Sequence, residues 1–165
     1  GLVGKQIARA LSEAGAVTFL ASRNLERLKL EAQKLREAGG DVHACSVDQC
    51  QEGSIQALLA HVLKSSGKVD ILVNNAVERP MKDWSDSGSA FARSMEVNAT
   101  GLFLITKIFG EQMARQGSGS IINIGSIQGM VGPDFTLYEG LDWGTPPDYF
   151  FHKGGMIQLT RFAAA

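Results

Sequence analysis

The segment "VDILVNNA", residues 69–76, joins a short apolar run to polar residues. The run is continuously apolar from Ile71 to Val73, and Asn74 and Asn75 follow it directly. A short continuous apolar run that ends in turn residues is typical of a strand buried on both faces, as in a parallel sheet. In open α/β sheets, ligands bind at the carboxyl ends of such strands, so these two asparagines mark a candidate site.

Similar strand patterns alternate with helical patterns along the rest of the chain. Apolar spacing predicts helices over residues 4–16, 24–40, 54–67 and about 91–115, and strands over 16–22, 41–47, 69–76 and 119–126. Short turns marked by glycine join these elements. The alternation predicts an α/β fold with a doubly wound parallel sheet, Rossmann-like, in three α/β/α layers.

Composition narrows the functional class. The chain has 165 residues, a formal net charge of −1 and 44% hydrophobic residues, which is typical of one globular domain. A charge near zero gives no reason to expect nucleic acid or an anionic membrane as a partner. Cys45 and Cys50 form neither a zinc pattern nor a disulfide framework, so we expect reduced cysteines and a cytoplasmic protein.

The two ends of the chain predict a fragment. The sequence begins at Gly1 without a methionine and stops inside "LTRFAAA", residues 159–165, without a helix stop signal. We therefore expect residues 1–165 to be a single nucleotide-binding domain truncated at both ends, lacking a first strand and a C-terminal part. Such a chain is expected to be poorly stable and inactive when isolated, because the sheet would lose a central strand.

Residues 145–153 combine a helix start with a tyrosine and a lysine. Thr145 has the form of an N-cap, Pro146 that of a first helical residue, and Asp148 follows three residues after the cap. Tyr149 and Lys153 then share one helix face. The structural alternative is a core tyrosine beside a lysine that reaches solvent.

Taken together, these segments resemble the short-chain dehydrogenase/reductase family over nearly the whole chain. The resemblance rests on "GLVG" at 1–4, "NNA" at 74–76, "MEVNATGLF" at 95–103, "IINIGS" at 121–126 and the Tyr-x-x-x-Lys at 149–153. The chain departs from the family at Val77, where the family has glycine. It also separates Ser126 from Tyr149 by 149 − 126 = 23 positions, where about a dozen is usual.

The resemblance implies a catalytic set and a reaction. Ser126 would orient a carbonyl oxygen, Tyr149 would exchange the proton, and Lys153 would bind ribose hydroxyls and stabilise the phenolate. Asn98 would distort its helix and hold a water that links Lys153 to solvent. The implied activity is NAD(P)-dependent interconversion of a secondary alcohol and a ketone, with a sugar acid, polyol or 3-oxoacyl substrate.

The resemblance also places the nucleotide. The implied cofactor-binding residues, besides Tyr149 and Lys153, are Gly1, Leu2, Val3, Gly4, Ser22, Arg23, Asp48, Gln49, Asn75 and Ala76. The glycine turn would let amides at a helix N-terminus approach a pyrophosphate. Each position has a plain structural alternative, namely a packing turn for the glycines, turn residues for the asparagines and helix capping for Asp48.

The end of the second family strand favours NADP over NAD. Family members that bind NAD usually carry an acidic residue there, which would repel a 2′-phosphate. This chain has Ser22 and Arg23 instead, and arginine suits a phosphate.

Three further expectations concern other residues. The loop 129–148, with Tyr138 and Trp143, is expected to line the substrate pocket. His43, His61 and His152 lack ligand spacing, so we expect structural or surface roles and no metal. Apolar helix faces starting at about Phe91 and at Tyr149 suggest a homodimer or homotetramer.

Two other classes of function stay open at this stage. One is an epimerase or dehydratase that retains NAD and uses the same serine, tyrosine and lysine. The other is a non-catalytic sensor that binds a nucleotide.

Overall fold

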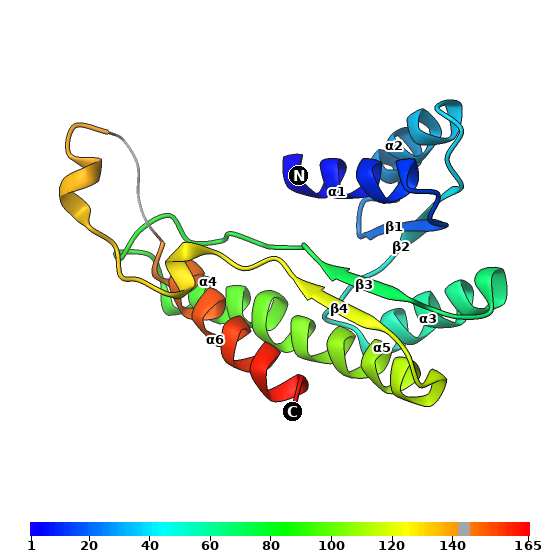
Figure 1. The fold of residues 1–165 in the computed structure, drawn as a ribbon. Coiled ribbons are helices and arrows are strands. Elements are labelled where there is room, and N and C mark those ends of the chain that lie inside the picture. Colours follow the sequence, from blue (N-terminus) through cyan, green and yellow to red (C-terminus); the bar gives the residue numbers. More distant parts are fainter. Residues whose placement is uncertain (142–145) are drawn as a thin grey trace.

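The computed structural model describes residues 1–141 and 146–165. Helices and strands alternate, as the sequence predicts (Figure 1). Their bounds are α1 (Leu2–Glu13), β1 (Thr18–Ser22), α2 (Leu25–Glu37), β2 (Val42–Ser46), α3 (Glu52–Ser66), β3 (Ile71–Asn74), α4 (Gly88–Met95), α5 (Leu102–Gln116), β4 (Ser120–Asn123) and α6 (Pro147–Ala163). A π-helical segment, Glu96–Gly101, separates α4 from α5, and short 3₁₀ turns cover Ile127–Gly129 and Phe135–Tyr138.

The strands form two parallel pairs. β1 pairs with β2 in register Thr18 to Val42, and β3 pairs with β4 in register Ile71 to Ser120. The prediction of an incomplete sheet of parallel strands is confirmed. Within residues 1–141 and 146–165 no hydrogen-bonded ladder joins β1 to β3, so the strands form two two-stranded sheets.

Helices cover the strands from opposite sides, which gives the predicted three layers. In Figure 1, α1 and α2 lie above β1 and β2, while α3, α5 and α6 lie below β3 and β4. The main core lies between the strands and helices α3 and α5. Its members include Ile55, Leu58, Leu72, Ile108 and Phe109.

The predicted helix over about 91–115 is interrupted. Its middle turn is π-helical from Glu96 to Gly101, so two α-helices replace one. Two contacts act on this turn. Asn98 turns its side chain inward to hydrogen-bond the segment after β3, and Gly101 lies so close to Gln49 that an added Cβ would come within 2.8 Å of its Cγ. π-bulges of this kind are often found at functional sites.

The start of α6 lies one residue later than predicted. Pro146 is the N-cap, with φ −71° and ψ 129°, and Pro147 is the first helical residue. The reason is that a proline disfavours helical geometry in the residue before it, which here is another proline. Thr145, the predicted cap, lies outside the described residues. At the start of α2, the N-cap Asn24 accepts a hydrogen bond from the amide of Arg27 with its side chain.

The core packing gives a direct stability prediction. Ile55 is 0% exposed in the core cluster, so Ile55→Ala leaves a cavity and should lower the free energy of unfolding by about 2–5 kcal/mol. Leu30→Ala in α2 is the matched control, because Leu30 is 62% exposed and should change stability by less than about 0.5 kcal/mol. Urea unfolding followed by circular dichroism measures both. Equal losses in the two variants would contradict this core.

Candidate active site

The residues predicted from strand ends lie at the carboxyl ends of the four strands. Asn74 ends β3 and is buried. Its amide nitrogen donates to Asn123 Oδ1 at 2.9 Å and to Thr106 Oγ1 at 3.2 Å. These bonds tie the end of β3 to β4 and α5. Asn74 therefore holds the strand ends together, while Asn75 and Ala76, which follow it, are more accessible.

The N-terminus of α1 lies against Asn75. An added Cβ on Gly4 would come within 2.7 Å of Asn75 Nδ2, so a side chain there would have to displace the Asn75 amide. Gly1 is the N-cap of α1 and has no side-chain capping bond. Backbone N–H groups in the first turn of a helix lack intrahelical partners and can bind an anion. The glycine turn at residues 1–4, which is expected to approach a pyrophosphate, thus lies next to the "NNA" residues 74–76.

Asn98 hydrogen-bonds the backbone of the segment that follows β3. It is 4% exposed, and its Oδ1 accepts a hydrogen bond from the Glu78 amide at 2.9 Å. Its Nδ2 donates to the Glu78 carbonyl at 2.7 Å and to Ser94 Oγ at 3.0 Å. The predicted distortion of the helix by Asn98 is confirmed by the π-helical turn around it.

The turn after β4 docks on α6. Ser126 is the N-cap of the turn Ile127–Gly129, and its Oγ accepts from the Gln128 amide at 3.2 Å. Gly129 lies directly on α6, where an added Cβ would come within 2.6 Å of the Lys153 carbonyl group. Such an approach to backbone excludes any side chain. Ser126 and Lys153 are therefore brought to the same corner of the fold.

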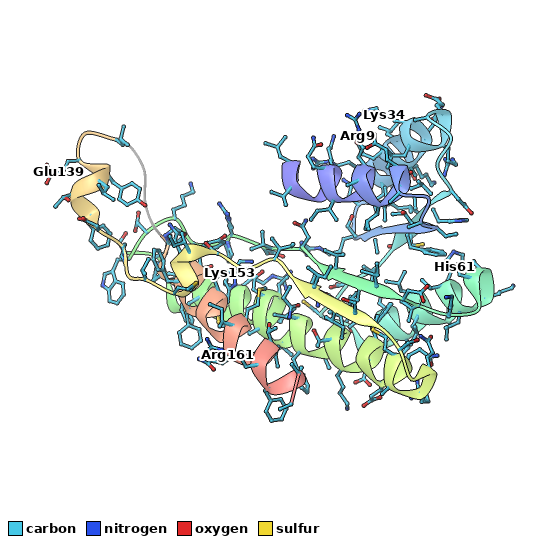
Figure 2. The ribbon with its side chains drawn as sticks, in the orientation of Figure 1. Arg9, Lys34, His61, Glu139, Lys153 and Arg161 are labelled. Atoms are coloured by element: carbon cyan, nitrogen blue, oxygen red, sulfur yellow. The ribbon has the colours of Figure 1, made fainter. Side chains whose placement is uncertain are left out.

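Lys153 is buried in that corner with a defined partner (Figure 2). It is 5% exposed, and its Nζ donates to the Ile124 carbonyl at 2.5 Å, just after β4. Nζ also lies 5.7 Å from the centre of the Tyr149 ring. Burial lowers the pKa of Lys153 and the nearby Arg79 lowers it further, while Tyr149 acts in the opposite direction.

Tyr149 has a second cation over its ring. The guanidinium of Arg79 lies 4.6 Å from the ring centre, from the segment that follows β3. Two cations thus lie near the Tyr149 ring, Arg79 from the segment after β3 and Lys153 from α6. The sequence reasoning missed Arg79. Its place three residues after "NNA" was the only available signal.

A small cavity connects several of these residues. It offers about 10 Å³ to the centre of a water, which is close to the minimum for one molecule. Its walls are Gln49, Asn74, Ala76, Asn98, Leu102, His152 and Met156. Among the described residues, neither ring nitrogen of His152 and neither carboxylate oxygen of Asp148 has a hydrogen-bond partner, although both side chains are buried. Of the two expected roles for His152, the surface role is wrong, because its side chain is 3% exposed.

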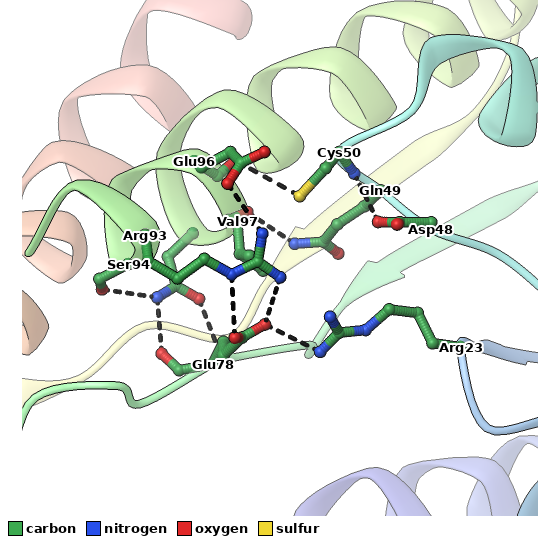
Figure 3. A network of polar contacts seen from close by, with 10 residues as sticks. Arg23, Asp48, Gln49, Cys50, Glu78, Arg93, Ser94, Glu96 and Val97 are labelled. Carbon is green, nitrogen blue, oxygen red and sulfur yellow. Dashed lines mark hydrogen bonds and ion pairs between the residues drawn. The ribbon is translucent and has the colours of Figure 1, made fainter. Parts of the chain in front are cut away.

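The adenine and ribose candidates have contacts of their own. Asp48 Oδ1 accepts from the Cys50 amide at 3.0 Å in the turn before α3. The N-cap of α3 is Gln51, and among the described residues no side chain caps the helix, so the structural alternative of helix capping by Asp48 is wrong. Gln49 donates to the Val97 carbonyl at 2.7 Å. Ser22 ends β1, and Arg23 after it is exposed and pairs with Glu78 at 2.8 Å (Figure 3). Glu78 is a second residue that the sequence reasoning missed.

The loop expected to line the substrate pocket is only partly described. Residues 130–141 project from the body of the molecule (Figure 1), and Phe135 and Leu137 are exposed. Asp142 and Trp143 lie outside the described residues. The pocket-lining role of this loop stays a prediction.

Two further observations concern metals and membranes. The described residues hold no cluster of potential metal ligands, and they form no helix with the length and apolar character of a membrane span.

Comparison with known proteins identifies the family. The sequence pattern of the family described as short chain dehydrogenase matches residues 2–140. The chain belongs to this family. The match includes Asn98 and Ser126, whereas Tyr149 and Lys153 lie beyond it.

Individual relatives extend the similarity over almost the whole chain. Galactitol 2-dehydrogenase (L-tagatose-forming) of Cereibacter sphaeroides is 31% identical over 99% of the chain and 60% of its own length. The structure of NAD⁺-bound xylitol dehydrogenase superposes with a TM-score of 0.88 at 30% identity, over 99% of this chain and 60% of that one. The structure of actinorhodin polyketide ketoreductase with NADPH superposes with a TM-score of 0.85 at 30% identity, over 97% of this chain and 59% of that one. The chain therefore spans about three fifths of the length of these relatives.

The docking of the turn on α6 can be tested by adding one methyl group. Gly129→Ala places a Cβ against the backbone of Lys153, which cannot move aside without shifting α6. The free energy of unfolding should fall by about 1–3 kcal/mol. Gly132→Ala is the control, because its Cβ would meet nothing within 4 Å. If Gly129→Ala unfolds in urea at the same midpoint as the control, the close packing described here is wrong.

The burial of His152 predicts a dependence of stability on pH. Burial, aided by the charge of Lys153, lowers the pKa of His152 from 6.5 to about 4. Between these values the unfolded chain binds a proton at His152 and the folded chain does not. The contribution is therefore fully present above pH 6.5 and is lost as the pH falls towards 4.

Unfolding free energies measured from pH 7.5 to 4 should show this loss. Relative to the unmodified protein, His152→Gln should have a shallower fall below pH 6.5. His61→Gln, which removes an exposed imidazole, is the control and should keep the original slope. Parallel curves for His152→Gln and the unmodified protein would show that His152 is not buried in neutral form.

Proposed function

We propose that the protein is an NAD(P)-dependent oxidoreductase that interconverts a secondary alcohol and a ketone. One observation carries the proposal. The buried Lys153 ammonium lies 5.7 Å from the Tyr149 ring, at the corner where Gly129 fastens the Ser126 turn to α6. A phenol, an ammonium and a hydroxyl in one corner are the groups needed to bind a carbonyl oxygen and move a proton to it.

Each side chain would have a separate task. Tyr149 would give a proton to the ketone oxygen or take one from the alcohol. Lys153 and Arg79 would stabilise the phenolate that remains, because both cations face its ring. Ser126 would hydrogen-bond the substrate oxygen and fix its direction.

The chain fits a nicotinamide nucleotide. The open N-terminus of α1 beside Asn75 suits a pyrophosphate, because free N–H groups and the helix dipole favour an anion. Asp48, Gln49 and Ala76 would line the adenosine, and Lys153 would reach the ribose hydroxyls. When bound, the nicotinamide supplies or accepts the hydride.

Asn98 would contribute to proton transfer between Lys153 and solvent, as well as to the stability of the fold. Its side-chain oxygen and nitrogen are occupied by Glu78 and Ser94, so its contribution to a water would come from its backbone or from the cavity that it lines. That cavity has room for about one water. A water there would connect the region of Lys153 to solvent.

The relatives support two substrate classes and both nucleotides. Sugar alcohols appear in the names of galactitol 2-dehydrogenase and xylitol dehydrogenase. A ketoacyl substrate appears in the name "Putative ketoacyl reductase" of a Streptomyces coelicolor protein, which is 34% identical. The xylitol dehydrogenase structure carries NAD⁺ and that of the polyketide ketoreductase NADPH. For this chain we favour a polyol, sugar acid or 3-oxoacyl substrate and NADP, the latter because of Arg23. We also propose a homodimer or homotetramer for the complete protein.

Tyr149 is the decisive residue for this proposal. Tyr149→Phe removes the hydroxyl that carries the proton, so kcat in the complete protein should fall at least about 100-fold. The measurement is the change in nicotinamide absorbance with a panel of ketones and alcohols. Binding of the reduced nucleotide, followed by its fluorescence, should persist in the variant.

Tyr138→Phe removes the only other tyrosine hydroxyl and is the comparison. It should alter KM for the substrate rather than kcat, because Tyr138 has no lysine four residues on. Turnover by Tyr149→Phe at the unmodified rate would overturn the proposed function. Nucleotide binding without turnover on any substrate would favour a sensor instead.

A further inference from the structure

Arg23 and Glu78 form an ion pair across the carboxyl ends of the two sheets (Figure 3). Arg23 follows β1, and Glu78 lies four residues after the end of β3, so the two residues are 55 positions apart. Their Nη2 and Oε2 atoms are 2.8 Å apart. Ligands of open α/β sheets bind outside these strand ends, so the ion pair lies at the mouth of the nucleotide site.

Glu78 is held in place independently of its carboxylate. Its backbone amide and carbonyl are both hydrogen-bonded to the buried side chain of Asn98. The carboxylate is therefore presented at a fixed point. It accepts bonds from Arg93 Nε and Nη2, both at 3.2 Å, as well as from Arg23.

The charges around Glu78 balance. Arg23 and Arg93 carry one positive charge each, and Glu78 and Glu96 one negative charge each. Glu96 contacts Arg93 at 2.8 Å. Burial alone would raise the pKa of Glu78, but the bonds from Arg93 and the charge of Arg23 hold it below its ordinary value. At neutral pH the carboxylate is ionised and occupies Arg23. Among residues 1–141 and 146–165, Glu78 is the only side chain that pairs with Arg23.

A carboxylate and a phosphate compete for the same guanidinium donors. Both are oxyanions, and both bind arginine through charge-assisted hydrogen bonds. A nucleotide with a 2′-phosphate must displace Glu78 from Arg23 or bind beside a negative charge. A nucleotide with a free 2′-hydroxyl meets no such competition.

We propose that Glu78 is a specificity-determining residue that lowers the affinity of the site for 2′-phosphorylated nucleotides by occupying Arg23. This inference rests on the proposed function, since it requires an adenine nucleotide at the strand ends. In this arrangement Arg23 favours NADP and Glu78 opposes it. The balance between the two side chains, and not Arg23 alone, sets the preference between NADP and NAD.

Glu78→Gln tests the inference by binding, without turnover. Adenosine 2′,5′-bisphosphate and 5′-AMP are titrated into the complete protein by calorimetry. Because the amide releases Arg23 and leaves an excess positive charge, the affinity for the bisphosphate should rise about tenfold relative to that for 5′-AMP. The bonds of Asn98 to the Glu78 backbone remain, so the fold should be retained.

Glu96→Gln is the matched control. It also removes a carboxylate from Arg93, but Glu96 has no contact with Arg23 among the described residues. The ratio of the affinity for the bisphosphate to that for 5′-AMP should therefore stay within about twofold of its value in the unmodified protein. In an Arg23→Gln background, Glu78→Gln should lose most of its effect, because the competed arginine is gone.

The outcomes separate this inference from the proposed function. If neither nucleotide binds the unmodified protein, the proposed function fails. If both bind and Glu78→Gln leaves their ratio unchanged, or weakens the bisphosphate, Glu78 does not compete for Arg23 and the inference alone fails. If Glu78→Gln does not fold, Glu78→Asp serves instead. The shorter side chain of aspartate cannot reach Arg23 as closely, so the affinity for the bisphosphate should rise relative to that for 5′-AMP. An unchanged ratio of these affinities would again overturn the inference.

Discussion

The buried ammonium of Lys153 determines how the candidate site is assembled. A charge removed from water needs a partner, and the Ile124 carbonyl supplies one at 2.5 Å. This bond fixes the end of β4 against α6. The chain between Ile124 and Gly129 must then turn sharply over the helix, which is possible because Gly129 has no side chain to meet the Lys153 backbone. Ser126 lies within that turn.

Hydrogen bonds between buried polar groups also fix the other side of the site. Asn98 is buried inside a helix, where an amide without partners would be costly, and it satisfies both its oxygen and its nitrogen on Glu78 and Ser94. The helix is π-helical at this point, and the segment after β3 is fixed by the same bonds. That segment in turn carries Glu78 to Arg23 and Arg79 to Tyr149. One asparagine thus positions charges near both Arg23 and Tyr149.

Much of the fold could be predicted from local patterns. Apolar spacing located the strands and the helices before β4 to within a few residues, whereas the distortion at Asn98 was implied by the family resemblance. One difference arose where a distant contact intervenes. The predicted helix over about 91–115 is divided by a π-helical turn, at which Asn98 bonds the segment after β3. The shift at Pro146 has a local cause, because Pro147 disfavours helical geometry in the residue before it.

Residue order alone was enough to establish the alternation of parallel strands and helices and the polar residues at the strand ends. These follow from periodicity and turn chemistry, which act over a few neighbouring residues. Packing was needed to bury His152 in a cavity wall, to give Lys153 its carbonyl and to give Arg23 its carboxylate. The partners in these bonds are 29 and 55 positions apart in the chain. No local pattern encodes such a pairing, because it depends on how whole elements pack.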